Sequence, residues 1–211
     1  MKAVLLSSIF SALLLAGVPK LQFTKSFPGS VPEYCSVEVN KSGVLLYKES
    51  ANEEPLTAKI QESDVTALFD MAEKLQYFST PIESGLKVAN TGKKTFRYEN
   101  ESGVATEVVF NYSLNETAKQ LLDRFENIAA TERAYIGLDR TIHFDKLGVN
   151  DSLAEIESLW LRKELAAPDQ FLPLLTRITT HDTFMHLVRE RAARLKDEFL
   201  APPGASATGQ K

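Results

Sequence analysis

Hydrophobic residues recur with two different spacings along the chain, and the spacing changes near Asn115. Over residues 21–112 they alternate with polar residues or cluster in short runs between turn residues, which is typical of β-strands. From Asn115 onward they recur every three or four residues, which is typical of amphipathic helices. The pattern therefore predicts an α+β fold, in which an antiparallel sheet with one helix precedes an all-α segment.

The first half is predicted to form short strands and one helix. The strands are expected at residues 23–27, 34–39, 44–49, 56–60, 86–90, 93–100 and 104–112. Hairpin turns are expected at Ser42-Gly43 and at Thr91-Gly92, because both pairs supply turn chemistry between strands. The helix is expected at residues 61–75, where apolar residues recur at helical spacing: Val65, Leu68, Phe69, Ala72 and Leu75.

The second half is predicted to contain one long helix followed by three shorter ones. Asn115 can cap the long helix, Gly148 would stop it, and Gly137 could divide it. Its buried stripe is expected to contain Ala118, Leu121, Leu122, Phe125, Ile128, Ala129, Tyr135, Ile142 and Leu147. The shorter helices are expected within residues 151–165, 168–179 and 183–200. The inward stripe of the last one would contain Phe184, Leu187, Val188, Arg191, Leu195 and Phe199.

The amino terminus has the pattern of a secretory signal peptide over residues 1–18, with Lys2 before a largely apolar run. This run is shorter than the roughly 20 residues that span a membrane, and no second run follows. We therefore expect an exported protein, periplasmic or secreted, with no transmembrane span in the mature chain; an uncleaved anchor is the alternative. Val18 stands where a lipoprotein would carry its acylated cysteine, which excludes lipidation by that route.

These patterns divide the chain into four parts. Residues 1–18 are the expected signal peptide, residues 21–114 the β-rich domain, residues 115–200 the helical domain, and residues 201–211 a disordered tail without core-forming residues.

Composition and charge exclude several classes of protein. The chain is 44% hydrophobic and 25% charged, which is typical of a globular protein. Its formal net charge is −4, and residues 21–114 carry 9 basic and 13 acidic side chains, so no nucleic-acid partner is expected. Cys35 is the one cysteine, so no internal disulfide can form. No phosphate-binding glycine loop, serine elbow, paired-cysteine metal site or calcium loop occurs, and no cofactor is expected.

The histidines offer two candidate sites. His181 and His186 are five residues apart, which on a helix places their rings about 140° apart, on different faces, so no zinc site is expected. His143 with Asp145 could take part in acid–base chemistry, although residues two apart on a helix do not face each other. Cys35 could be a nucleophile only with a histidine nearby, and it is otherwise a small apolar strand residue.

The strongest candidate for ligand binding is a group of basic residues around the predicted turn at Thr91-Gly92. It consists of Lys87, Lys93, Lys94 and Arg97, which at one hairpin tip could receive a carboxylate or phosphate. The alternative is a solvated sheet face whose lysines discourage pairing with other sheet edges.

Several segments are similar to those of a known protein family: FPGSVPEY, SGLKVANTGKKTFRYEN, NYSLNETAKQL, FDKLGVNDSLAEIE, QFLPLLTRI and HLVRERAARL. In these segments the chain resembles a family of exported bacterial proteins of unknown function. The β-rich half is also similar to a broader group of domains that often begin with a cysteine-containing Gly-Pro turn; here the turn is FPGSVPEYC, with one cysteine. The resemblance implies export, but it brings no activity and no site residues.

Together these features predict a non-catalytic exported protein that binds another macromolecule or a component of the cell envelope. One alternative is a hydrolase that uses carboxylates and His143. The other is a binder of anions or small ligands that uses the lysine-rich hairpin.

Overall fold

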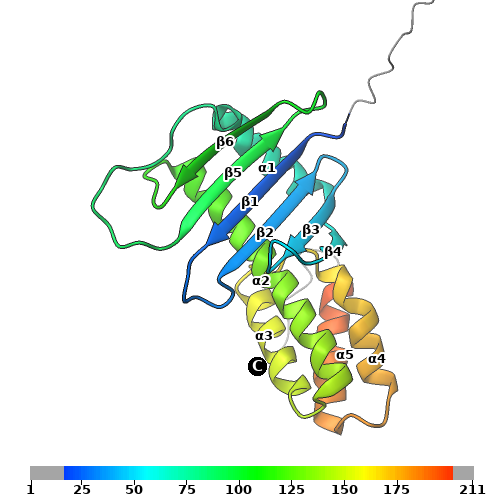
Figure 1. Ribbon diagram of the computed structural model, residues 1–211. Helices are drawn as coiled ribbons and strands as arrows, with labels where there is room; N and C mark the ends of the chain where they lie inside the picture. Colours follow the sequence, from blue (N-terminus) through cyan, green and yellow to red (C-terminus); the bar gives the residue numbers. More distant parts are fainter. Residues whose placement is uncertain (1–16, 202–211) are drawn as a thin grey trace, which may run out of the picture.

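The computed structural model describes residues 17–201, which form a six-stranded antiparallel sheet and five α-helices (Figure 1). The strands lie in the spatial order β4-β3-β2-β1-β5-β6. Their bounds are Lys20–Ser26 (β1), Tyr34–Asn40 (β2), Val44–Lys48 (β3), Leu56–Lys59 (β4), Lys93–Glu99 (β5) and Ala105–Phe110 (β6). The predicted α+β class is thus confirmed, with the helical segment after the sheet. The expected signal peptide and tail lie almost wholly outside the described residues.

One face of the sheet is covered by helix α1 (Glu62–Lys74) and by the first half of helix α2 (Glu116–Phe144), which lie behind the sheet in Figure 1. Strand alternation places Phe23 of β1 and Phe96 of β5 on this face, where both are fully buried. The ring of Phe125 from α2 lies 5.5 Å from that of Phe23 and 5.9 Å from that of Phe96. These aromatic contacts fix α2 across the middle of the sheet.

The predicted hairpin between β2 and β3 is confirmed. The side-chain oxygen of Asn40 accepts hydrogen bonds from the backbone N–H groups of Ser42 and Val44, both at 3.0 Å. Gly43 has φ +81°, and a Cβ there would lie 3.0 Å from the backbone oxygen of Ile60. Glycine is therefore required by both the conformation and the close approach.

The predicted strand at residues 86–90 is wrong, and so is the hairpin at Thr91-Gly92. Residues 80–92 form no strand, and they cannot form a hairpin with β5 because β5 is paired with β1 on one side and with β6 on the other. The end of this loop is held instead by the Asn111 side chain, which accepts a hydrogen bond from the backbone N–H of Thr91 at 2.8 Å. A propensity for extended structure does not by itself specify a strand, because pairing with a neighbouring strand is decided by the tertiary structure.

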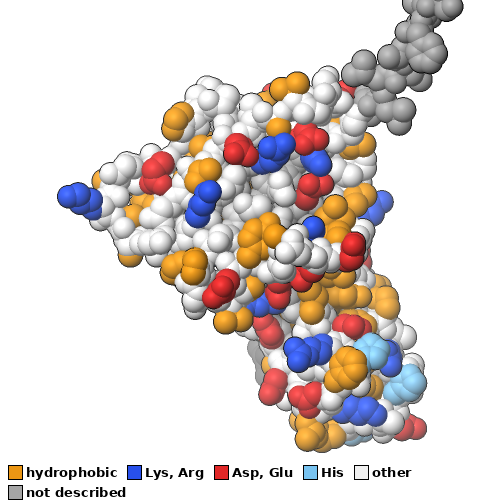
Figure 2. Space-filling view, viewed as in Figure 1, with side chains coloured by type: hydrophobic (Ala, Val, Ile, Leu, Met, Phe, Trp, Pro, Cys, Tyr) orange, Lys and Arg blue, Asp and Glu red, His pale blue; other side chains and the backbone are white. Residues whose placement is uncertain are grey.

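The opposite face of the sheet is open and carries interspersed charges of both signs (Figure 2). Lys20 of β1 lies 3.4 Å from Glu38 and 3.8 Å from Glu99, and Arg97 lies 3.5 Å from both Glu99 and Glu107. Such exposed pairs contribute little to stability, but they keep this surface solvated.

The helical part contains the second half of α2 and four further short elements. These are α3 (Val149–Leu161), the 3-10 turn η2 (Pro168–Phe171), α4 (Leu172–Thr180) and α5 (His186–Leu200). They form a second core around Leu138 of α2, with Leu153, Leu175 and Leu195 from the other helices. Leu121, Phe125 and Ile128, in the first half of α2, belong to the core of the sheet. The division between the two cores therefore falls inside α2 rather than at its start.

Three details of the predicted helices are wrong. Helix α2 runs unbroken through Gly137 but ends at Phe144, and Gly148 is the N-cap of α3 rather than the stop of α2. Leu147 lies in the turn between these helices and is 78% exposed. Leu187 is 66% exposed because it is about 100° around α5 from the buried Val188. The spacing of apolar residues did not reveal the end of α2, because Leu147 in the turn continues the helical spacing.

The N-cap of α2 provides a test of this fold. The side-chain oxygen of Asn115 accepts a hydrogen bond from the backbone N–H of Ala118 at 3.1 Å, as the sequence predicted. Asn115→Ala is expected to lower the free energy of unfolding by about 0.5–2 kcal/mol, whereas Asn115→Asp keeps an acceptor and is expected to change it little. Urea denaturation of the three proteins measures both effects; equal losses in the two variants would contradict the capping role.

Candidate ligand-binding site between the sheet and helix α2

The histidine pair considered for zinc is separated by the fold. His181 is the C-cap of α4, whereas His186 is the first residue of α5. Within residues 17–201, no cluster of three or more His, Cys, Asp or Glu side chains is arranged to hold a metal ion. The same part of the chain contains no helix that is both long and apolar enough to span a membrane.

The other histidine, His143, does not pair with Asp145. Its Nδ1 lies 2.7 Å from the backbone oxygen of Asp139, and its Nε2 lies 2.8 Å from a guanidinium nitrogen of Arg177. The Asp145 carboxylate accepts a hydrogen bond from the backbone N–H of Gly148 at 3.2 Å. Both ring nitrogens and the carboxylate thus have separate partners at the end of α2, which does not support the acid–base pair.

The four basic residues of the predicted hairpin point in different directions. Lys87 is exposed in the loop before β5, and Lys93 and Arg97 lie on the open face of the sheet. Lys94 alone lies on the opposite face, under α2, where it is 4% exposed. Because strand neighbours alternate between faces, residues 93 and 94 cannot share a site on one surface.

A second lysine, Lys25 of β1, is the direct cross-strand neighbour of Lys94 and shares its face of the sheet. Its ammonium lies 2.7 Å from a carboxylate oxygen of Glu126 on α2. The sequence contained a signal for this residue, since Leu21, Phe23 and Lys25 occupy successive inward positions of one strand. A lysine in the third of these positions indicates that a charge lies between the sheet and the helix.

The Lys94 ammonium is held by uncharged oxygens. It donates hydrogen bonds of 2.8 Å to the hydroxyl of Thr91 and of 2.8 Å to the backbone oxygen of Asn111. No carboxylate among the described residues forms an ion pair with it. Burial lowers the pKa of Lys94 and the charge of the neighbouring Lys25 lowers it further, while the more distant charges of Glu126 and Glu83 raise it in part. Lys25, Lys94 and Glu126 thus bring two ammonium groups and one carboxylate together between the sheet and α2.

A cavity of about 400 Å³ lies beside these charges, and we call it the lysine cavity. Lys25, Lys94 and Glu126 line its inner part, together with Ser113 and Phe110. Its outer part adds one charge of each sign: Lys119, which lies 2.7 Å from Glu116, and Asp123. Ligand pockets for small molecules fall in this range of volume.

A second cavity, of about 210 Å³, lies on the other side of the ion pair, and we call it the alanine cavity. Lys25 and Glu126 line both cavities, so the ion pair forms the wall between them. Its other lining side chains are mainly apolar and include Phe23, Cys35 and Ala129. Burial raises the pKa of the Cys35 thiol, which favours its neutral form here.

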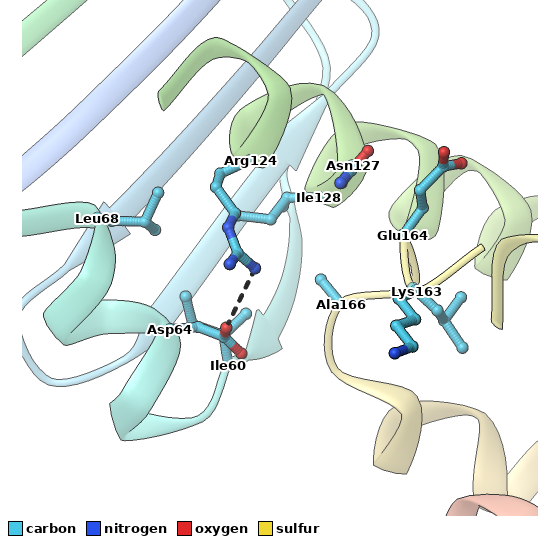
Figure 3. A pocket seen from close by; sticks show the side chains of 10 residues that line it. Ile60, Asp64, Leu68, Arg124, Asn127, Ile128, Lys163, Glu164 and Ala166 are labelled. Carbon is cyan, nitrogen blue, oxygen red and sulfur yellow. Dashed lines mark ion pairs between the residues drawn. The ribbon is translucent and has the colours of Figure 1, made fainter. Parts of the chain in front are cut away.

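A third cavity, between α1, α2 and the chain after α3, is too small for such a ligand (Figure 3). Its volume is about 50 Å³, which is room for one or two water molecules. Asp64 and Arg124 face each other across it at 4.0 Å. This cavity is therefore a weaker candidate than the two cavities around Lys25 and Glu126.

Comparisons of the chain with family models, with curated proteins and with solved structures found no match.

Proposed function

We propose that the protein is a non-catalytic binding protein of the cell envelope and that its ligand is a small anion held between β1, β5 and α2. The observation that carries the proposal is the buried ammonium of Lys94, which lies beside a cavity of about 400 Å³ and forms no ion pair with any carboxylate of residues 17–201. The envelope location rests on the signal-like pattern of residues 1–18.

The physical reason is the free-energy cost of a buried, uncompensated charge. Hydrogen bonds to uncharged oxygens offset only part of the hydration that an ammonium loses on burial. Glu126 cannot neutralise both lysines, since it already pairs with Lys25 at 2.7 Å. An anion in the lysine cavity would supply the missing negative charge and would form a charge-assisted hydrogen bond with Lys25 or Lys94.

Acetate is the simplest probe of this site. Lys94→Met is expected to weaken acetate binding at least tenfold, because it removes the uncompensated charge. Lys93→Met is the matched control: Lys93 is the adjacent residue but lies on the open face, so its loss is expected to leave binding unchanged. Titration of backbone amide NMR signals with acetate at constant ionic strength measures both affinities.

A variant that is expected to bind acetate more tightly shows that a change in affinity comes from the site and not from damage to the fold. Glu126→Gln removes the carboxylate that competes with the ligand, so acetate is expected to bind about five- to tenfold more tightly. Misfolding cannot produce this result. The proposal is overturned if native protein shows no acetate-dependent shifts, or if Glu126→Gln leaves the affinity unchanged or weakens it.

A further inference from the structure

The inner end of the lysine cavity has a net positive charge. Lys94 is 4% exposed, and its ammonium donates hydrogen bonds of 2.8 Å to uncharged oxygens. Lys25 and Glu126 form the ion pair beside it, so these three groups together carry a charge of +1. The same ion pair is the wall toward the alanine cavity, so a ligand that binds Lys94 extends toward solvent along α2.

The outer end of the lysine cavity has a net negative charge. Asp123 lines it, is exposed, and forms no ion pair with any cation of residues 17–201. Lys119 pairs instead with Glu116 at 2.7 Å, which is the favourable order for a helix because the acidic residue precedes the lysine. Lys119 and Glu116 cancel each other, and the charge of −1 on Asp123 remains.

The two ends of the cavity are about one helical turn apart. Asp123 precedes Glu126 by three residues on α2, so the two side chains are neighbours on one side of the helix, with Cβ atoms about 5–6 Å apart. Glu126 in turn contacts Lys25, which is the direct cross-strand neighbour of Lys94. A small molecule can therefore reach the inner positive charge and the outer negative charge at the same time.

A simple anion would match only the inner end of the cavity. Bound at Lys94, it would be repelled by the nearby carboxylate of Asp123, because charges a few ångströms apart interact appreciably near a protein surface. A positive group on the outward side of the ligand turns this repulsion into attraction. That group would lie at the solvent side of the cavity, where it keeps part of its hydration and loses little on binding.

We propose that the ligand is an α-amino acid, with its carboxylate bound by Lys94 and Lys25 and its ammonium bound by Asp123. This inference rests on the proposed anion-binding function. An α-amino acid carries its two charged groups on one carbon atom, which suits two protein charges one helical turn apart. A peptide separates the same groups by about 3.3–3.6 Å more for each added residue.

The ammonium group of the ligand is the first test. Glycine is acetate with an added ammonium, and it is expected to bind the native protein about five- to tenfold more tightly than acetate. N-acetylglycine keeps the carboxylate but has no charge on its nitrogen, and it is expected to bind no more tightly than acetate. Diglycine is expected to bind at least twofold more weakly than glycine. All four probes are titrated by the same NMR method at constant ionic strength.

The variant Asp123→Asn tests the outer end of the cavity with effects of opposite sign. It is expected to lower glycine affinity about two- to fivefold and to raise acetate affinity about twofold, so that the two probes bind equally. A damaged fold would weaken both probes. Asp139→Asn is the control, because Asp139 is an acidic residue of α2 outside the cavity, and it is expected to preserve the preference for glycine.

The outcomes separate this inference from the function on which it rests. If acetate and glycine bind equally to the native protein and both require Lys94, the anion site stands and the amino-acid inference is wrong. If neither probe binds, the proposed function and this inference both fail. If N-acetylglycine binds as tightly as glycine, or if Asp123→Asn keeps the preference for glycine, Asp123 does not bind an ammonium. If diglycine binds more tightly than glycine, the ligand class is a peptide and the inference is wrong.

Discussion

Replacing Phe125 by alanine is expected to lower the free energy of unfolding by about 3–5 kcal/mol, the range for a buried aromatic side chain. Phe125 is fully buried, and its ring packs against those of Phe23 and Phe96 at 5.5 Å and 5.9 Å. Truncation would leave a void where α2 crosses the sheet. Urea denaturation followed by circular dichroism measures the loss.

Phe144 provides a matched control on the same helix. It lies at the last position of α2 and is 86% exposed, so Phe144→Ala is expected to change the free energy of unfolding by less than about 0.5 kcal/mol. Similar losses in the two variants would mean that α2 does not pack against the sheet through Phe125.

The second large effect concerns Glu132, a carboxyl group buried in the middle of α2 with 0% exposure. One of its oxygens accepts a hydrogen bond of 3.0 Å from the side-chain amide of Gln170, and the other has no partner among the described residues. Burial raises the pKa of Glu132 from 4.5 to about 7, and the hydrogen bond from Gln170 offsets this only in part. The folded protein therefore favours the protonated form.

This raised pKa makes stability depend on pH. Because the folded state binds the proton more tightly than the unfolded state, the contribution of Glu132 is fully present below about pH 4.5. It is lost as pH rises to about 7, and above that pH the ionised carboxylate costs about 3 kcal/mol relative to low pH.

Glu132→Gln removes this dependence. The variant is expected to be more stable than the native protein by up to about 3 kcal/mol at pH 8, and of similar stability at pH 4. The measurement is the difference in unfolding free energy between the two proteins, from urea denaturation at several pH values. Glu155→Gln, at an exposed position of α3, controls for the loss of a surface charge. A constant difference from pH 4 to pH 8 would show that Glu132 does not titrate in this range.

Membership of a family of exported proteins remains a prediction, and so does the export that it implies. The comparisons found no relative, and residues 1–16 lie outside the described structure. The proposed ligand site therefore rests on the geometry of Lys25, Lys94 and Glu126 alone.

Local patterns in the sequence determined the elements of the fold. The period of two along β1 and the period of 3.6 along α1 each have a cause within a few residues, so they could be predicted without the structure. The same holds for the turn at Gly43, which needs a positive φ, and for the cap at Asn115, whose acceptor lies three residues from its donor.

Only the tertiary structure decided which elements meet. The sequence predicted a strand at residues 86–90, but β1 and β6 occupy both edges of β5, and strand pairing over long separations has no local signal. It also grouped Lys94 with Lys93 and Arg97, which are neighbours in the chain but lie on the other face of the sheet. The actual neighbours of Lys94 are Lys25, 69 positions earlier, and Glu126, 32 positions later on α2. A charge imbalance between three separate elements exists only once the chain has folded, and that is why the candidate site could not be predicted from the sequence.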